Sequence, residues 1–143
     1  MVCLGNICRS PLAEGILKKK LPQDRFRVDS AGTEGYHIGH SPDQRSIEVA
    51  AHNGIDIRHL KARKFIIDDF DRFDKIIVMD RSNLANVRKM ALNSDHQMKV
   101  ALLSENDEVP DPYYGNEDGF EKVFKLIDEA CEQLSYELLK PLL

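Results

Sequence analysis

The pattern of apolar positions is most regular near the end of the chain. Apolar residues there recur every three or four positions, as on one face of an α-helix: Phe120, Val123, Phe124, Ile127, Cys131, Leu134 and Leu138. The pattern predicts a long helix with this stripe against the core. Cys131 lies on the stripe, so we interpret it as a small buried hydrophobe rather than a redox residue.

Three further helices are predicted upstream. The first begins at Ser10, a capping hydroxyl followed by proline, and ends near a run of three lysines at 18–20. The second begins at a capping box over residues 41–44 and ends at the Asn-Gly pair 53–54. The third follows Asp80, which is its predicted cap.

Short apolar or alternating runs predict strands between these helices. They cover residues 26–31, 76–79 and 100–103, and a polar loop with prolines follows from Ser104 to Gly119. Runs 76–79 and 100–103 are apolar throughout, as expected for strands buried on both faces of a parallel sheet. Alternating strands and helices predict one α/β domain over residues 1–143, a doubly wound parallel sheet with helices on both faces.

Composition narrows the classes of function. The chain has 20 Lys plus Arg and 24 Asp plus Glu, a net charge of −4, so we expect no nucleic-acid partner, because such binders present a net-positive face. No apolar run approaches the roughly 20 residues of a membrane helix, so we expect no membrane insertion.

The cysteines and histidines bear on compartment and metal content. Three cysteines, Cys3, Cys8 and Cys131, cannot form a complete disulfide framework in one chain, and this favours a cytoplasmic protein. The five histidines are dispersed, so the spacing predicts no metal site.

Candidate chemistry is concentrated between Val2 and Pro11. A predicted strand end passes there through a tight turn with Gly5 into a helix N-terminus, where backbone N–H groups and the helix dipole favour an anion. Cys3 at the start of the turn experiences the same field, which favours a thiolate. Arg9 at its end offers a planar fork for two phosphate oxygens. A Cys and an Arg at this spacing form a weak signal when taken alone.

The segment Cys-Leu-Gly-Asn-Ile-Cys-Arg-Ser-Pro, at residues 3–11, closely resembles the signature of the low-molecular-weight protein tyrosine phosphatases. The resemblance covers nearly the whole chain, and the first and last matching segments together are very specific. Its further segments are 29–33, His59 with Ala62-Arg63, 73–83, and Asp-Pro-Tyr-Tyr-Gly at 111–115.

The resemblance implies a cysteine-dependent phosphatase without metal or cofactor. Cys3 would be the nucleophile, Arg9 would bind the phosphoryl group and Asp111 would be the general acid. A positioned acid fits the chemistry, because the leaving phenolate has a pKa of about 10. Substrate would contact the turn and three tyrosines, at Leu4, Gly5, Asn6, Ile7, Cys8, Tyr36, Tyr113 and Tyr114.

The resemblance also implies a supporting set of hydrogen-bonding residues, Asn6, Ser10, Ser30 and His59. A surface or core histidine is the alternative for His59. Tyr113 and Tyr114 are favoured as aromatic walls over regulatory phosphorylation sites, whereas Tyr36 fits a substrate contact and an ordinary surface loop equally well. Cys8 either pairs with an oxidised Cys3 or packs passively.

Other functions on this fold stay open. An arsenate reductase would relay oxidation through extra cysteines, but only Cys131 is available downstream. A protein arginine phosphatase tends to have Thr where Ile7 stands. A phosphate-binding or thiol redox-sensing module would lack the acid. We expect a phosphotyrosine protein as partner, with a tyrosine kinase as one candidate, and a monomer or weak dimer.

The start of the chain departs from the family pattern. Family members carry several residues before the signature, which form a central strand, whereas only Met1 and Val2 precede Cys3 here. We therefore expect about four strands in a flavodoxin-like sheet with a truncated N-terminal strand. Loss of such a strand leaves backbone groups unpaired and hollows the core.

Overall fold

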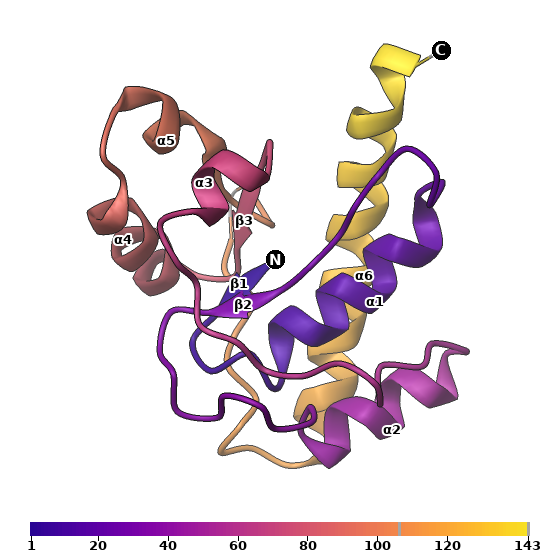
Figure 1. The fold of residues 1–143 in the computed structure, drawn as a ribbon. Coiled ribbons are helices and arrows are strands. Elements are labelled where there is room, and N and C mark those ends of the chain that lie inside the picture. Colours follow the sequence, from indigo (N-terminus) through magenta and orange to yellow (C-terminus); the bar gives the residue numbers. More distant parts are fainter. Residues whose placement is uncertain (106, 143) are drawn as a thin grey trace.

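A four-stranded parallel sheet forms the centre of the computed structural model, which describes residues 1–105 and 107–142 (Figure 1). Its strands lie in the order β2-β1-β3-β4. Their bounds are β1 Val2–Cys3, β2 Ala31–Gly32, β3 Ile76–Val78 and β4 Val100–Leu102. Asn106, inside the predicted loop, and Leu143, at the end of the predicted domain, lie outside the described residues.

The register places Cys3 at the carboxyl edge of an inner strand. Val2 pairs with Ala31 on one side and with Val78 on the other, and Cys3 pairs with Gly32. The Cys3 carbonyl then accepts a hydrogen bond from the Thr33 amide at 2.9 Å. Ligands bind outside this edge in parallel α/β sheets, so the chain from Cys3 onward enters the expected place for a site.

Helices cover both faces of the sheet, which confirms the predicted doubly wound architecture (Figure 1). One side holds α1 (Arg9–Lys20), α2 (Gln44–His52) and α6 (Glu117–Leu139), followed by the 3₁₀ turn η1 (Lys140–Leu142). The other side holds α3 (Asp69–Arg72), α4 (Arg81–Met90) and α5 (Ser94–Lys99). Among the described residues, no helix is both long and apolar enough to cross a membrane.

A separate apolar core lies on each side. The larger core includes Leu12 and Ile16 of α1 packed with Ile127 of α6, and the smaller one includes Phe65, Phe70 and Val87. The predicted stripe of the last helix is confirmed, since Phe120, Val123, Ile127 and Cys131 are almost completely buried. Burial raises the pKa of the Cys131 thiol to about 12, as expected for an inert core residue.

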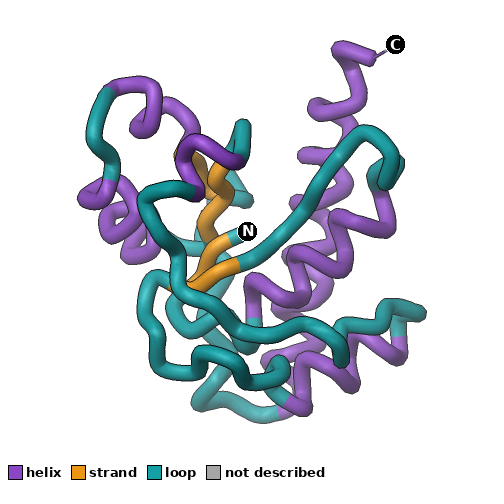
Figure 2. The backbone as a smooth tube through the Cα atoms, in the orientation of Figure 1, coloured by secondary structure: helices purple, strands orange, loops and turns teal. Residues whose placement is uncertain are grey.

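The predicted strands are correct in place but longer than those observed. Residues 26–30 run as irregular backbone, and only Ala31–Gly32 pairs in the sheet. β3 is buried throughout, as predicted. β4 is not buried on both faces, because it lies at the sheet edge and exposes Ala101. Long loops therefore join short strands (Figure 2).

Two predicted helix caps are wrong. Cys8, rather than Ser10, occupies the capping position of α1, and Ser10 lies inside the helix with its hydroxyl turned to the site. Asp43, not Ser41, caps α2 by accepting a hydrogen bond from the Arg45 amide. By contrast, Asp80 caps α4 as predicted and forms a reciprocal capping box with Asn83. The short helices α3 and α5 were not predicted.

Candidate active site

Three chain segments meet at a pocket of about 280 Å³ at the carboxyl edge of the sheet. The turn after β1 forms its floor, and two loops with aromatic side chains form its walls. Its lining residues are Cys3, Leu4, Gly5, Ile7, Cys8, Arg9, Tyr36, His37, Asp111, Tyr113 and Tyr114. The structure thus brings together every predicted catalytic and substrate-contacting residue except Asn6. The Asn6 side chain is directed instead to Ser10 and Ser30.

The turn over residues 4–8 depends on two unusual backbone positions. Asn6 has a φ of 58°, in the left-handed region that asparagine tolerates better than most residues. Gly32 packs so closely that a Cβ there would lie 2.8 Å from the Leu4 carbonyl oxygen. The turn leads directly into α1, so the first amides and the dipole of that helix face the pocket.

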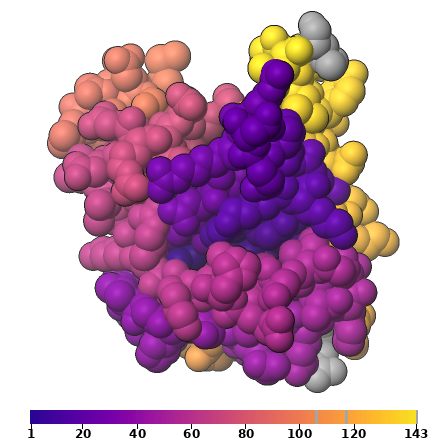
Figure 3. Space-filling model, turned by 45° about the vertical axis from the view of Figure 1, so that its right-hand side comes forward, coloured from indigo at the N-terminus to yellow at the C-terminus, as the bar shows by residue number. Residues whose placement is uncertain are grey.

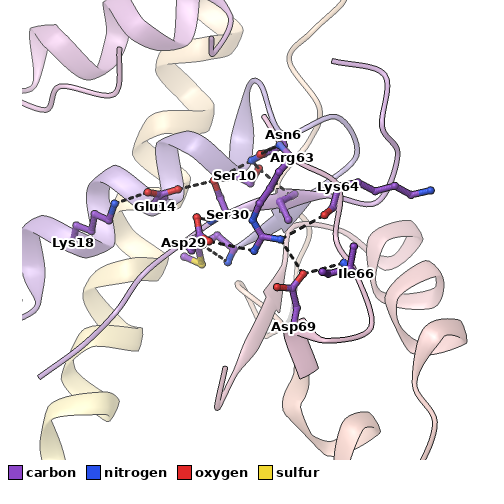
Figure 4. Close-up of polar contacts among 12 residues, drawn as sticks. Asn6, Ser10, Glu14, Lys18, Asp29, Ser30, Arg63, Lys64, Ile66 and Asp69 are labelled. Carbon is purple, nitrogen blue, oxygen red and sulfur yellow. Dashed lines mark hydrogen bonds and ion pairs between the residues drawn. The ribbon is translucent and has the colours of Figure 1, made fainter. Parts of the chain in front are cut away.

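The Cys3 thiol contacts Ser10, which belongs to a buried chain of hydrogen bonds with Asn6, Ser30 and Glu14 (Figure 4). Asn6 Nδ2 donates to Ser10 Oγ at 2.7 Å and to Ser30 Oγ at 2.9 Å, and Ser30 Oγ donates to Glu14 Oε1 at 2.7 Å. Ser10 Oγ therefore accepts from Asn6 and lies 3.0 Å from Cys3 Sγ. Its own proton can be donated to the sulfur or to the Ala31 carbonyl oxygen, which lies 3.4 Å away.

Arg9 is a fully enclosed cation beside the thiol, with only 2% of its surface exposed. Its Nη1 donates to Asp80 Oδ2 at 2.7 Å and to the Val109 carbonyl at 3.0 Å. Burial lowers the pKa of Arg9, but Cys3, Asp80 and Asp111 outweigh that effect and the net pKa is raised. Arg9 therefore remains a permanent positive charge on the pocket floor.

Asp111 faces this cation from the loop that precedes α6. Its Oδ2 lies 3.6 Å from Arg9 Nη2, and its Oδ1 accepts a hydrogen bond from the Tyr113 amide at 3.1 Å. The side chain is 38% exposed, so a water molecule or a substrate oxygen can reach it. An acid, a guanidinium and a thiol thus line one pocket, an arrangement suited to phosphoryl transfer.

Aromatic residues line the mouth of the pocket. Tyr113 and Tyr114 pack edge to face with ring centroids 4.9 Å apart, and Tyr114 is 96% exposed. Tyr36 is also exposed, and His37 lies between it and Tyr113. These rings form a surface that suits a planar aromatic group.

His59 does not join the predicted network. It lies exposed in a turn after α2, and within residues 1–105 and 107–142 no hydrogen bond links it to Asn6, Ser10 or Ser30. The Arg63 backbone amide donates to Asn6 Oδ1 instead, at 3.0 Å. The approach of the residue 62–64 segment to β2 explains this, because Gly32 N–H donates to the Arg63 carbonyl and brings that backbone to Asn6.

Four contributors were missed or only partly interpreted from the sequence. Asp80 was predicted only as a helix cap, although it follows β3 at the same edge as Cys3 and also holds Arg9. Glu14 and the Val109 carbonyl gave no sequence signal of a site role. His37 adjoins the predicted Tyr36 in a loop that the family resemblance places at the substrate cleft, although His37 itself was not predicted as a site residue.

The other thiols are free and buried. Cys8 is buried at the end of the turn, where burial and the nearby Asp43 raise the pKa of its thiol to about 12. It is therefore protonated at neutral pH. In the part of the chain that the structure describes, no group of three or more His, Cys, Asp or Glu side chains is arranged to hold a metal ion.

Comparisons with known proteins point to one family. The family model for low molecular weight phosphotyrosine protein phosphatases matches residues 1–142. The low molecular weight protein-tyrosine-phosphatase YfkJ of Bacillus subtilis is 42% identical over 149 residues, which cover 97% of this chain and 94% of that protein.

Solved structures are similar over the same length. A protein tyrosine phosphatase from Entamoeba histolytica, with Hepes in its active site, has a TM-score of 0.92 at 36% identity and covers 99% of this chain and 96% of that one. Vibrio vulnificus Wzb in complex with benzylphosphonate has a TM-score of 0.88 at 31% identity, with coverage of 95% and 94%.

Proposed function

The chain belongs to the low molecular weight phosphotyrosine protein phosphatase family, and from this premise we propose how its own residues hydrolyse phosphotyrosine in proteins. Cys3 is the nucleophile, Arg9 holds the phosphoryl group and Asp111 is the general acid. The observation that carries the proposal is the single pocket in which thiol, guanidinium and carboxyl group converge.

In the first step the Cys3 thiolate attacks phosphorus in line with the bond to the tyrosyl oxygen. The S–P bond forms, the P–O bond breaks, and Asp111 gives its proton to the leaving oxygen. Because a free phenolate has a pKa of about 10, protonation during departure lowers the barrier. The products are a phosphocysteine and tyrosine.

The turn stabilises the charge that develops on the phosphoryl oxygens. Arg9 is pinned through Nη1 by Asp80 and Val109, which leaves Nη2 directed to the pocket near Asp111. The backbone amides of residues 4–8 and the α1 dipole supply further positive potential. The Ser10 hydroxyl stabilises the thiolate when it attacks and when it leaves.

In the second step Asp111, now ionised, accepts a proton from water. The water oxygen attacks phosphorus, the S–P bond breaks and inorganic phosphate is released. The exposed fraction of Asp111 supports this role, since water reaches the carboxylate from the pocket mouth.

The aromatic mouth supports an aryl substrate. Tyr36, Tyr113 and Ile7 line the pocket around the position that a tyrosine ring would take. A relative that binds benzylphosphonate supports the same ligand chemistry, a phosphorus oxyanion joined to a benzyl group.

Four further points belong to this proposal. We expect a single domain over residues 1–143, a monomer or weak dimer, and a cytoplasmic location, the last supported by the free thiols Cys3, Cys8 and Cys131. A phosphorylated tyrosine kinase remains one candidate among the protein substrates.

The test is leaving-group dependence in Asp111→Ala. We expect kcat for phenyl phosphate to fall by roughly 10² to 10⁴-fold, with a smaller loss for aryl phosphates whose phenols are acidic. Cys3→Ser gives the zero-turnover reference. Asp107→Ala removes another carboxylate of the same loop and is the matched control. Equal leaving-group slopes in wild type and Asp111→Ala would reject Asp111 as the acid.

A further inference from the structure

The first turn of α2 contacts both loops that form the pocket. On the side of the nucleophile, the Asp43 amide donates to the Ile7 carbonyl at 2.8 Å, and Ser46 Oγ donates to the Cys8 carbonyl at 3.3 Å. On the side of the acid, Arg45 donates to two backbone carbonyls of the loop after Asp111. One helical turn therefore joins the two halves of the site.

From these contacts we propose that Arg45 is a positioning residue that sets where Asp111 lies relative to Cys3 and Arg9. The proposal rests on the function proposed above, because it assigns Arg45 a role only if Asp111 is the acid. Arg45 does not line the pocket and acts through the loop backbone.

Arg45 is held as a rigid fork. Its Nε and Nη2 donate to the two oxygens of Asp43, at 3.0 and 2.9 Å, and Asp43 is itself fixed as the cap of α2. The guanidinium also lies over the Phe120 ring, 4.4 Å from its centroid, with the Tyr113 ring at 5.9 Å. A planar cation on an aromatic face with two carboxylate bonds has few alternative positions.

The remaining guanidinium donors reach the acid loop. Nη2 donates to the Tyr113 carbonyl at 2.9 Å and Nη1 to the Gly115 carbonyl at 3.1 Å. Within residues 1–105 and 107–142, these are the only hydrogen bonds that reach the backbone of residues 112–116 from outside residues 111–119. Val109, paired with Met79, anchors the loop before Asp111, so Arg45 supplies the anchor after it.

Loss of the Arg45 guanidinium should affect proton donation by Asp111 more than the other chemical steps. Without the guanidinium, residues 112–116 lose their external anchor, and the Asp111 carboxyl group samples positions away from the leaving oxygen. A displacement on the order of 1 Å lowers rates by up to about 10²-fold. Proton donation to poor leaving groups should therefore suffer, whereas phosphate binding by the turn and Arg9 should persist.

The chain carries its own control for this experiment. Asp56 and Arg58 form the same local pair as Asp43 and Arg45: the Arg58 amide, Nε and Nη2 each bond to Asp56 at 3.0 Å. Arg58, however, has a side chain that is 75% exposed, and among the described residues it has no hydrogen bond to the acid loop. Removing Arg58 takes away the same charge and local motif without touching the site.

The experiment compares Arg45→Met, Arg45→Lys, Arg58→Met and Asp111→Ala on p-nitrophenyl phosphate and phenyl phosphate, with inhibition by inorganic phosphate measured in each. For phenyl phosphate we expect Arg45→Met to lose between about 5- and 100-fold in kcat. The loss on p-nitrophenyl phosphate should be smaller and the phosphate inhibition constant unchanged. Arg45→Lys should be intermediate, because one ammonium group cannot reproduce the fork. It also keeps the test available if Arg45→Met does not fold.

The outcomes separate the two proposals. A steep leaving-group dependence in Asp111→Ala with a wild-type dependence in Arg45→Met overturns the role of Arg45 and leaves the acid in place. A wild-type dependence in Asp111→Ala rejects the acid itself. Equal losses on both substrates, or weakened phosphate inhibition, in Arg45→Met but not in Arg58→Met would mean that Arg45 acts on the phosphate turn, and would also overturn the proposal.

Discussion

Asp80 joins two parts of the structure through one carboxylate. Its Oδ2 holds Arg9 at 2.7 Å, while its Oδ1 accepts the Asn83 amide at 2.8 Å and caps α4. Asp80→Asn keeps an oxygen for the cap but removes the charge and presents an amide nitrogen or a neutral oxygen to Arg9. Asp80→Ala removes both interactions. The two variants therefore separate the cap from the ion pair.

The expected magnitudes follow from burial. A charge-assisted hydrogen bond contributes about 1.5–3 kcal/mol and a helix cap about 1 kcal/mol. Arg9 is only 2% exposed, so water does not replace the lost partner, but Asp111 at 3.6 Å and the Val109 carbonyl offset part of the loss. We expect unfolding free energies lowered by about 2 kcal/mol in Asp80→Asn and by about 3 kcal/mol in Asp80→Ala.

Urea unfolding and kcat/KM measured on the same samples check this reasoning. Both variants should lose roughly tenfold or more in kcat/KM, because Arg9 is free to turn toward Asp111 and away from the phosphoryl position. Asn93→Ala is the matched control: it removes the cap of α5, which accepts the His96 amide at 2.8 Å, and does not touch Arg9. Wild-type stability and activity in Asp80→Asn would refute the argument. Equal stability of the Asn and Ala variants would refute the separate contribution of the cap.

Two further predictions concern the thiols. Peroxide should inactivate the enzyme reversibly through a Cys3–Cys8 disulfide. The disulfide should form slowly, because burial raises the pKa of Cys8 to about 12. Peptide mapping that finds only irreversible Cys3 acids, with no linked peptide, would contradict this. Burial also raises the pKa of Cys131 to about 12, from 9.0 for a free thiol, so the stability that this neutral thiol contributes should be complete below pH 9 and decline as the pH rises toward 12. The free energy of unfolding measured with urea should therefore fall less steeply between pH 8 and pH 11 in Cys131→Ala than in the wild type. Parallel curves for the two proteins would contradict the raised pKa of Cys131.

The fold was predictable where periodicity and burial agree. The stripe on α6 repeats over 19 residues from Phe120 to Leu138, and the apolar run at β3 has both faces covered by helices. The short helices α3 and α5 span four and six residues, too few to establish a period. Residues 26–30 alternate like a strand, but the one main-chain hydrogen bond described between them and β1 or its neighbouring residues is that from the Met1 amino group to the Asp29 carbonyl, because ladder pairing depends on a neighbour that local sequence does not specify.

The site was predictable as a set of side chains and less so as a network. Sequence places Cys3 and Arg9 on one turn, and the resemblance places Asp111 above it. Ser10 shows where local rules fail: its position before a proline is typical of a cap, yet its hydroxyl serves the thiol instead. This role depends on contacts that exist only in the folded chain, where Ser10 meets Cys3, Asn6 and Ala31. On the face shown in Figure 3, later segments of the chain cover most of its start.

His59 and the Arg63 amide illustrate a different limit. Histidine is conspicuous in a sequence, so it invites a role, whereas a backbone N–H is present at almost every residue and gives no signal. The group that binds Asn6 Oδ1 is nevertheless the Arg63 amide, placed there because its segment joins the edge of β2. Contacts made by main-chain groups are set by the sheet register, and the register becomes visible only in the folded chain.

The two Asp-x-Arg motifs show the same dependence on tertiary contacts for a single residue type. Residues 43–45 and 56–58 form the same local pair, with an aspartate that accepts both the backbone amide and the guanidinium of the arginine two positions later. Local sequence therefore determines the geometry of both motifs and does not distinguish between them. Only the packing of Phe120 and the acid loop against Arg45 gives one motif a route to Asp111, while Arg58 projects into solvent. The functional difference between two identical local structures thus lies in the tertiary contacts, and comparing Arg45→Met with Arg58→Met measures that difference directly.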